Sequence, residues 1–266
     1  MNAKALLLSL CLALSAPAFA DSADIASQVA AAQAGDTDAM INLADMYFNG
    51  TYDVEQDYAK ARQYYEQAAK AGSASAQYYL GVMYENGDGV EQDNRKAMFY
   101  YLQAAKQNDI DSVFTVATFY DDGVDGVKQN FAKANEYYQL GIKLEDPRAF
   151  NNMGFNHERG RGVPLDLDKA RSLYQQAADL GSPDGLFNMA IIYDTGLGVT
   201  PNAKKALPYY IKAADAGHPG AQYNMGVMYD NGEGGLKKNA KKARAYYEQA
   251  ADQGYEDAID ALANLD

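Results

Sequence analysis

The sequence predicts an all-α solenoid, built from about six helix-turn-helix repeats with a half-repeat cap at each end. Two observations support this prediction. A Lys-Ala pair recurs six times at intervals of 36 or 37 residues, and each copy stands in the same pattern of aromatic, small and glycine residues. A fixed period in this range is typical of stacked supersecondary units, each of which buries its apolar face only against its neighbours.

The Lys-Ala pairs mark the start of the second helix of each repeat, called helix B. Three residues before each lysine stands an aspartate or asparagine, whose side-chain oxygen can accept hydrogen bonds from the free amides of a first helical turn. We therefore expect six N-caps. The pairs are Lys60-Ala61, Lys96-Ala97, Lys133-Ala134, Lys169-Ala170, Lys205-Ala206 and Lys242-Ala243, and the expected N-caps are Asp57, Asp93, Asn130, Asp166, Asn202 and Asn239.

The rest of helix B also repeats. Two large residues follow, usually Tyr-Tyr as in Tyr64-Tyr65, and then two alanines as in Ala68-Ala69. A proline inside a helix removes a hydrogen bond, so we expect Pro208 to kink the fifth B helix or delay its start. Glycine adopts the left-handed backbone that ends a helix at least cost. Four B helices are followed by such a glycine: Gly72, Gly181, Gly217 and Gly254.

The first helix of each repeat, helix A, follows that glycine. Residues 75–84 are typical, with Ala76, Leu80 and Tyr84 on one helical face. A glycine-bearing turn leads to helix B, and the 37-residue intervals place their extra residue in this turn, where an insertion costs least. We expect an N-terminal capping helix at 21–34, six repeats at 35–254 and a C-terminal capping helix at 255–266.

Residues 1–20 have the pattern of a secretory signal peptide that is cleaved after Ala20. Lys4 gives one positive charge, residues 5–14 are an apolar run, and small residues precede the cleavage site. The run is shorter than the roughly 20 apolar residues of a membrane span. Cys11, the only cysteine, lies inside this run. We expect a periplasmic or secreted protein with no integral membrane segment after cleavage.

Composition argues against several functions. The formal net charge of -13 makes nucleic acid a poor partner. The two histidines, His157 and His218, lie about 60 residues apart with no cysteine beside them, which gives no zinc-like spacing. His218 precedes Pro219 in a predicted turn and is expected to be solvated. No Ser-His-Asp set stands out. We expect no enzyme activity, no cofactor and no metal.

The repeat resembles a known family. The string A-x-A-Q-Y-x-L/M-G-V-M-Y-x-N-G-x-G-V, followed by x-x-D-x-x-K-A-x-x-Y-Y-x-x-A-A-x-x-G, resembles the Sel-1-like repeat family, relatives of tetratricopeptide repeats. The resemblance covers residues 35–254. It implies a right-handed α/α superhelix with the A helices on the concave side, and a role in assembling protein complexes, often as an exported bacterial protein. Unlike the cysteine-rich members, this chain has no cysteine in its repeats.

If tetratricopeptide geometry holds, two rows of A-helix side chains face the groove. Aromatic rings give a large contact area at little entropic cost, and a ladder of carboxylates attracts Lys or Arg. We expect a protein or peptide partner with basic and apolar residues. The aromatic row is Ile41, Tyr78, Phe114, Asn151, Phe187 and Tyr223. The acidic row is Phe48, Glu85, Asp121, Glu158, Asp194 and Asp230.

Both rows have a structural alternative. The aromatic row could pack between repeats, and the acidic residues could pair with helix B lysines, worth about 0–1 kcal/mol for each exposed pair. The fourth repeat also departs from the others, because Arg148, Phe155, Arg159 and Arg161 stand at or near groove positions and His157 replaces a tyrosine. This departure indicates either specificity or relaxed constraint.

Two classes of function fit these features. The first is an exported, non-catalytic adaptor or regulator in the cell envelope, which would release its partner on a signal. The second is a secreted or immunity-type binder that neutralises a toxin, an enzyme or a host protein, which would bind almost irreversibly. In both cases we expect a monomer.

Overall fold

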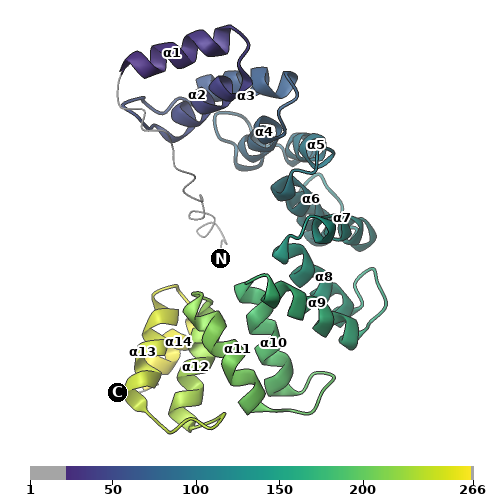
Figure 1. Ribbon diagram of the computed structural model, residues 1–266, viewed down its shortest axis with the longest axis vertical. Helices are drawn as coiled ribbons and strands as arrows, with labels where there is room; N and C mark the ends of the chain where they lie inside the picture. The colour runs from purple at the N-terminus through teal and green to yellow at the C-terminus, as the bar shows by residue number, and fades with distance from the viewer. Residues whose placement is uncertain (1–21, 265–266) are drawn as a thin grey trace. The chain divides into compact units, whose positions relative to one another are not determined.

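The computed structural model describes residues 22–264, and within them it contains 14 α-helices and no β-strand (Figure 1). The predicted all-α repeat fold is therefore confirmed. The expected signal peptide, residues 1–20, lies outside the described residues, as does the end of the expected C-terminal cap. The helices are α1 (Ser22–Gln33), α2 (Thr37–Asn49), α3 (Tyr58–Lys70), α4 (Ala74–Asn86), α5 (Asn94–Ala105), α6 (Ile110–Asp122), α7 (Phe131–Lys143), α8 (Pro147–Arg159), α9 (Leu167–Asp179), α10 (Pro183–Thr195), α11 (Ala203–Asp215), α12 (Pro219–Asn231), α13 (Ala240–Ala251) and α14 (Glu256–Asn264).

The even-numbered helices from α2 to α12 are the A helices, and each packs against the B helix that follows it, from α3 to α13 (Figure 1). The chain divides at Ala104, near the end of α5, into two compact units. The N-terminal unit holds the first two helix pairs and the C-terminal unit holds the other four.

Each B helix begins at the expected N-cap. The lysine amide of every Lys-Ala pair donates a hydrogen bond of 2.8–3.1 Å to the Asp or Asn side chain three residues earlier. Truncating such a cap typically costs about 0.5–2 kcal/mol. The turns before Asn130 and Asn239 start at Gly123 and Gly232 and carry the extra residue of the longer intervals, as predicted.

The B helices end as the glycines predict. Gly72, Gly181, Gly217 and Gly254 have φ values of 99°, 84°, 85° and 79°. The second and third repeats have no glycine there, and Asn108 (φ 62°) and Glu145 (φ 59°) adopt the left-handed conformation instead. For Glu145 this conformation is unfavourable, because its β-carbon crowds the following carbonyl oxygen.

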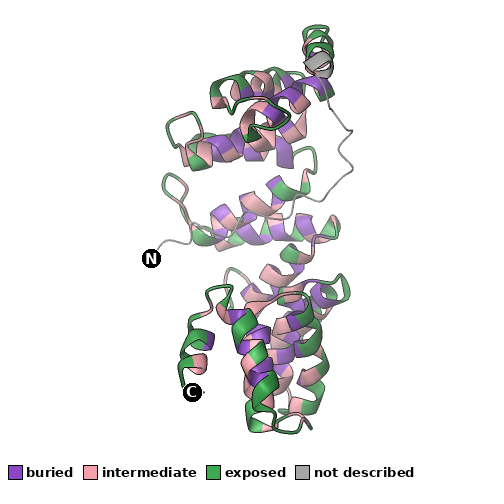
Figure 2. Ribbon diagram, turned by 90° about the vertical axis from the view of Figure 1, so that its left-hand side faces the viewer, coloured by how far each residue is buried: buried purple, intermediate pink, exposed green. Residues whose placement is uncertain are grey.

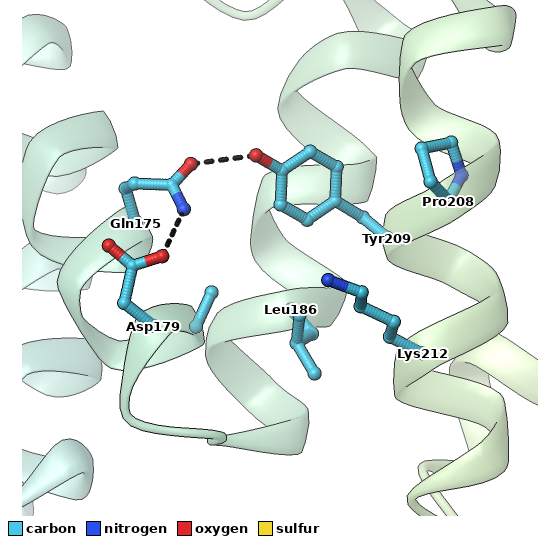
Figure 3. Close-up of a pocket in the computed structure, with 7 residues that line it drawn as sticks. Gln175, Asp179, Leu186, Pro208, Tyr209 and Lys212 are labelled. Atoms are coloured by element: carbon cyan, nitrogen blue, oxygen red, sulfur yellow. Dashed lines mark hydrogen bonds between the residues drawn. The ribbon is translucent and has the colours of Figure 1, made fainter.

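Pro208 does not delay the start of the fifth B helix, so that alternative is wrong. α11 begins at Ala203 with Asn202 as its N-cap, five residues before the proline, and continues to Asp215. Pro208 is the sixth residue of α11, so its missing N–H leaves the carbonyl of Lys204 without a helical partner. The exposed ring lines an open pocket on the B-helix side, where it has room (Figure 3).

The second tyrosine of each B-helix pair forms the centre of the core, where buried residues lie between paired helices (Figure 2). The fourth repeat supplies Tyr174 in the same place, and none of these six rings is more than 4% exposed. Each lies near a small A-helix residue. At Gly81, Gly154 and Gly226 a β-carbon would come within 2.4–3.0 Å of the ring, so the helices approach closely there. The other three repeats have Ala44, Ala117 and Ala190 at this position.

The first tyrosine of the pair takes part in a second contact between A and B helices. Tyr84 of α4 stacks on Tyr100 of α5 at 5.7 Å, and Lys96 lies 5.1 Å above the Tyr84 ring. The same lysine–tyrosine–tyrosine stack occurs in the first, third, fifth and sixth repeats. The fourth repeat has His157 and Leu173 instead of the two tyrosines and lacks this stack.

Candidate functional site

The acidic row lies against the buried tyrosines. The Tyr101 hydroxyl donates to Glu85 Oε2 at 2.5 Å. The equivalent bonds join Tyr174 to Glu158 at 3.0 Å and Tyr210 to Asp194 at 3.1 Å. The alternative that these carboxylates pair with helix B lysines is wrong for these three repeats. In the second and fifth repeats the lysines Lys96 and Lys205 instead lie over tyrosine rings, and Lys96 also pairs with Asp93, which caps its own helix.

The first repeat makes the same contact from another position. Phe48 stands in the acidic row there, and its ring packs edge-on against Tyr65 at 6.5 Å. Asp45, one turn earlier on α2, accepts the Tyr65 hydroxyl hydrogen bond at 2.5 Å. Sequence reasoning missed Asp45. The signal was that the first repeat has Phe48 in the acidic row and an aspartate three residues earlier.

These contacts change the acidity of both groups. Burial raises the pKa of Tyr210 above its ordinary range, and the neighbouring carboxylate of Asp194 raises it further. Burial, with a smaller contribution from Asp230, raises the pKa of Tyr247 to about 12. Burial also raises the pKa of Asp45, which the hydrogen bond from Tyr65 partly offsets. The tyrosines are thus protonated donors at neutral pH, and the carboxylates are their acceptors.

The aromatic row packs against the same tyrosines. Ring centroids lie 5.6 Å apart for Tyr78 and Tyr101, and 6.2 Å apart for both Phe114–Tyr138 and Phe187–Tyr210. The pair Tyr223–Tyr247 follows at 5.7 Å. All four row members are half-buried. Packing within the repeats therefore accounts for much of this row.

The next repeat covers part of two of these rings. His218 stacks on Phe187 at 4.2 Å, and the Arg148 guanidinium lies 4.5 Å above Phe114. His218 is the N-cap of α12, and its Nδ1 accepts a hydrogen bond of 3.1 Å from the Ala221 amide. The expectation of a solvated His218 is therefore wrong. Asn151 replaces the ring in the fourth repeat and accepts a 2.8 Å bond from Asn188 of α10.

A third row lies between these two on the A helices, one turn after the aromatic row. In the C-terminal unit it consists of half-buried, mainly apolar side chains, and we call it the apolar row: Thr118, Phe155, Ile191 and Val227. Its positions follow the aromatic row by four residues and precede the acidic row by three, so all three rows share one helical face. Sequence reasoning singled out only Phe155, although the four-residue spacing indicated the others. We call this surface the A-helix face.

Asp121 is used inside the protein and is only 8% exposed. The Asn156 amide donates to Asp121 Oδ1 at 3.3 Å and to Asn135 Oδ1 at 2.8 Å. Asn135 in turn donates to the Arg161 carbonyl at 2.8 Å, which fastens the turn after α8 to α7. Asn135 and Asn156 are buried polar residues that sequence reasoning missed, because the other repeats have other residue types at these positions.

The fourth repeat brings Phe155, Glu158 and Arg159 together. The Arg159 guanidinium lies 5.6 Å from the Phe155 ring centroid and 3.2 Å from Glu158 Oε1. Arg161, in the following turn, lies 4.8 Å from the same ring. Arg148 is not part of this group, because it pairs with Asp146 at 2.9 Å and Asp111 at 2.8 Å.

A pocket of about 290 Å³ opens on the other side of the C-terminal unit, between α9 and α11 (Figure 3). On its wall the Tyr209 hydroxyl donates to Gln175 at 2.7 Å, and Gln175 donates to Asp179 at 2.8 Å. An equivalent pocket of about 300 Å³ in the N-terminal unit lies between α3 and α5, with Tyr100 in the place of Tyr209. Packing of successive B helices produces both.

Two further findings apply to residues 22–264 alone. No group of His, Cys, Asp or Glu side chains in that range is arranged to hold a metal ion. No helix in the same range is both long enough and apolar enough to cross a bilayer.

A family model described as Sel1 repeat matches the chain six times, and most of the matched segments begin at or near the first residue of an A helix. The matches cover residues 37–73, 74–109, 114–146, 147–182, 183–218 and 219–255. A comparison with curated proteins found none that matches.

Several solved structures are similar. A protective antigen from uropathogenic Escherichia coli is 31% identical with a TM-score of 0.74, and the alignment covers 90% of this chain and 50% of that protein. This chain thus spans half the length of that relative. A Sel1 repeat protein from Oxalobacter formigenes is 26% identical with a TM-score of 0.75, covering 86% and 97% of the two chains. An immunity protein from Pseudomonas aeruginosa is 18% identical with a TM-score of 0.54, covers 82% of each chain and shares the fold alone.

Proposed function

The chain belongs to the Sel1 repeat family, and from that premise we propose that it is an exported, non-catalytic protein that binds a polypeptide partner on its A-helix face. Sel1 repeat proteins generally mediate protein–protein interactions, and the scaffold is generally non-catalytic. The proposed export is supported by the signal-peptide pattern of residues 1–20. The proposed partner surface is that of the C-terminal unit, where four A helices follow one another.

The apolar row carries this proposal. Phe155, Ile191 and Val227 stand on three successive A helices, and each is only partly covered by its own repeat. These side chains lie between the aromatic row and the acidic row, and apolar side chains bordered by charged groups are typical of the core and rim of a protein interface. A bound segment would bury these side chains further, which stabilises the complex by about 25 cal/mol for each Å² of apolar surface removed from water.

Charge indicates what else the partner should contain. Asp194 uses only one carboxylate oxygen for Tyr210, and Asp230 is exposed on the next A helix. The whole chain has a net charge of -13. A segment that places lysine or arginine near Asp194 and Asp230 would therefore be attracted and oriented. We propose a helix or extended segment with apolar residues and basic residues.

The test is to select peptides from a phage-displayed random library on the purified protein, and to measure their affinity by fluorescence anisotropy. We expect peptides rich in apolar and basic residues. Ile191→Gln should weaken binding about tenfold, a loss of about 1.4 kcal/mol. Ile211 lies on α11 and is 37% exposed, so Ile211→Gln is the matched control and should leave affinity unchanged.

Two results would count against the proposal. One is that no peptide is enriched over a column without protein. The other is that Ile211→Gln weakens binding as much as Ile191→Gln, while both variants unfold at the wild-type temperature. A neutralising role, as in the immunity proteins of this fold, would use the same surface. It would differ in the dissociation rate of the natural partner, which should be far slower for a neutraliser than for an adaptor.

A further inference from the structure

The guanidinium groups of two arginines lie against the same aromatic ring, that of Phe155 on the A-helix face. The guanidinium carbons of Arg161 and Arg159 lie 4.8 Å and 5.6 Å from the centroid of Phe155. Arg161 also lies 5.5 Å from the ring of Phe131, at the start of α7. Stacking on two rings holds the Arg161 side chain in place, because a cation over an aromatic face is attracted to it. The backbone of Arg161 is fixed as well, since its carbonyl accepts the hydrogen bond from Asn135.

The nearby carboxylates are already used. Glu158 accepts the Tyr174 hydroxyl on one oxygen at 3.0 Å and lies 3.2 Å from Arg159 through the other. Asp121 is buried and accepts a hydrogen bond from Asn156. Within the described part of the chain, Arg161 forms no ion pair. The group of Arg159, Arg161 and Glu158 therefore carries one net positive charge, and the buried Asp121 attracts Arg161 without forming an ion pair with it.

The helix dipole favours Arg159 but does not account for Arg161. A cation in the last turn of a helix is stabilised by about 0.3–1 kcal/mol, and Arg159 stands in the last turn of α8. However, the other five A helices end without a basic residue. Arg161 lies beyond the helix and its C-cap Gly160, so it is outside that turn.

We propose that Arg159 and Arg161 bind a carboxylate of the partner polypeptide, an aspartate or glutamate side chain, over the edge of Phe155. This inference rests on the proposed function, because Phe155 belongs to the apolar row. A guanidinium presents planar pairs of N–H donors that match a carboxylate, and stacking on a ring leaves those donors free at its edge. Arg159 is 60% exposed at its side chain, so it can turn from Glu158 toward a ligand.

The consequence is a fixed register. Asp194 and Asp230 of repeats five and six stand at the position of Glu158 in repeat four, and only in repeat four does this position have arginines beside it. A partner segment with an acidic residue at repeat four and basic residues toward repeats five and six matches this order of charges. The same segment in the opposite direction would place like charges together, which costs affinity.

The test uses one peptide from the library selection and its analogue with a single Asp→Asn or Glu→Gln change. On the wild-type protein we expect the acidic peptide to bind about tenfold more tightly than its analogue, because a hydrogen-bonded ion pair contributes more than a neutral contact. Arg161→Gln should abolish that difference, and Arg161→Lys should retain part of it. Arg171→Gln removes an arginine of α9 that pairs with Asp168, and is the matched control.

The double-mutant cycle separates recognition from structure. Arg161→Gln could lower the affinity of the acidic peptide and of its analogue by the same factor. In that case the arginine has only a structural role, and the inference fails while the proposed function stands. The inference fails in the same way if the selected peptides bind this face but contain no acidic residue whose neutralisation lowers their affinity. If no peptide is enriched at all, both the proposed function and the inference fail.

Discussion

Tyr210 of α11 donates a hydrogen bond of 3.1 Å to Asp194 of α10. The same hydroxyl accepts one of 3.1 Å from Asn224 of α12, so a single buried oxygen joins three successive helices. Removing a buried group of this kind leaves its partners unsatisfied, which costs more than the bond itself contributes.

We therefore predict that Tyr210→Phe lowers the free energy of unfolding by about 1–3 kcal/mol, as measured by urea denaturation. Tyr209→Phe is the control, because the neighbouring hydroxyl bonds Gln175 at a half-buried site and should cost less. Equal losses of unfolding free energy in the two variants would show that the buried Tyr210 hydroxyl contributes no more to stability than the half-buried Tyr209 hydroxyl.

Asp121 should make stability depend on pH. Burial raises its pKa, an effect that the Asn156 hydrogen bond and Arg161 only partly offset. A carboxyl with a raised pKa in the folded state contributes stability below its unfolded pKa, and this contribution is lost as the pH rises through the folded pKa. At neutral pH the buried charge is thus a cost, which Asp121→Asn removes.

Accordingly, Asp121→Asn should be more stable than the wild type at neutral pH, and the difference should shrink as the pH falls into the range where aspartates protonate. Urea denaturation at several pH values measures this. Asp122→Asn removes a neighbouring carboxylate that also raises the pKa of Asp121, so it should show the same trend to a smaller extent. A difference that stays constant with pH would contradict the assignment.

Glu145 offers a stabilising change. Its left-handed backbone (φ 59°) costs an L-residue about 1–2 kcal/mol, and glycine avoids this cost while losing about 0.5–1 kcal/mol of chain entropy. Glu145→Gly should thus stabilise the protein by about 0.5–1 kcal/mol, visible as a rise in melting temperature. The reverse change, Gly217→Ala, should destabilise it through the backbone alone, because no atom lies within 4 Å of the added β-carbon. A fall in melting temperature for Glu145→Gly would contradict the claim that the backbone conformation of Glu145 destabilises the protein.

The missing stack of the fourth repeat can be rebuilt. His157→Tyr with Leu173→Tyr should place Lys169 over a stacked pair, as Lys205 lies over Tyr193 in the fifth repeat. We expect a gain of about 0.5–1 kcal/mol, measured by urea denaturation. Each single change should give less than the double, since the second ring completes the stack. Additive or unfavourable effects would show that the stack contributes nothing here.

Much of the fold could be predicted because the repeat period shows which positions are equivalent in successive helix pairs. The N-caps, the glycine ends and the turns with an extra residue are local features, set by residues within a few positions of one another. The expected delay at Pro208 was wrong because Asn202 caps α11 and the helix begins at Ala203, before the proline.

The candidate site was harder to predict. The sequence placed Glu85 and Asp194 on one face, but their contact with buried tyrosine hydroxyls depends on how deeply the B helix sits against its partner. Asp45 replaces the absent acid of the first repeat from one turn away, which a strict alignment of positions does not show. The buried amides of Asn135 and Asn156 occur in single repeats, so no periodicity indicates them.

The small A-helix residue beside each buried tyrosine alternates along the chain, alanine in odd repeats and glycine in even ones. In the even repeats a methyl group would fall within 2.4–3.0 Å of the ring, whereas the odd repeats already accommodate one. A hybrid hairpin that joins an odd A helix to an even B helix would force these atoms together. For anyone who shortens, lengthens or shuffles this array, the transferable module is therefore an intact hairpin, which keeps each A helix with the B helix of its own repeat.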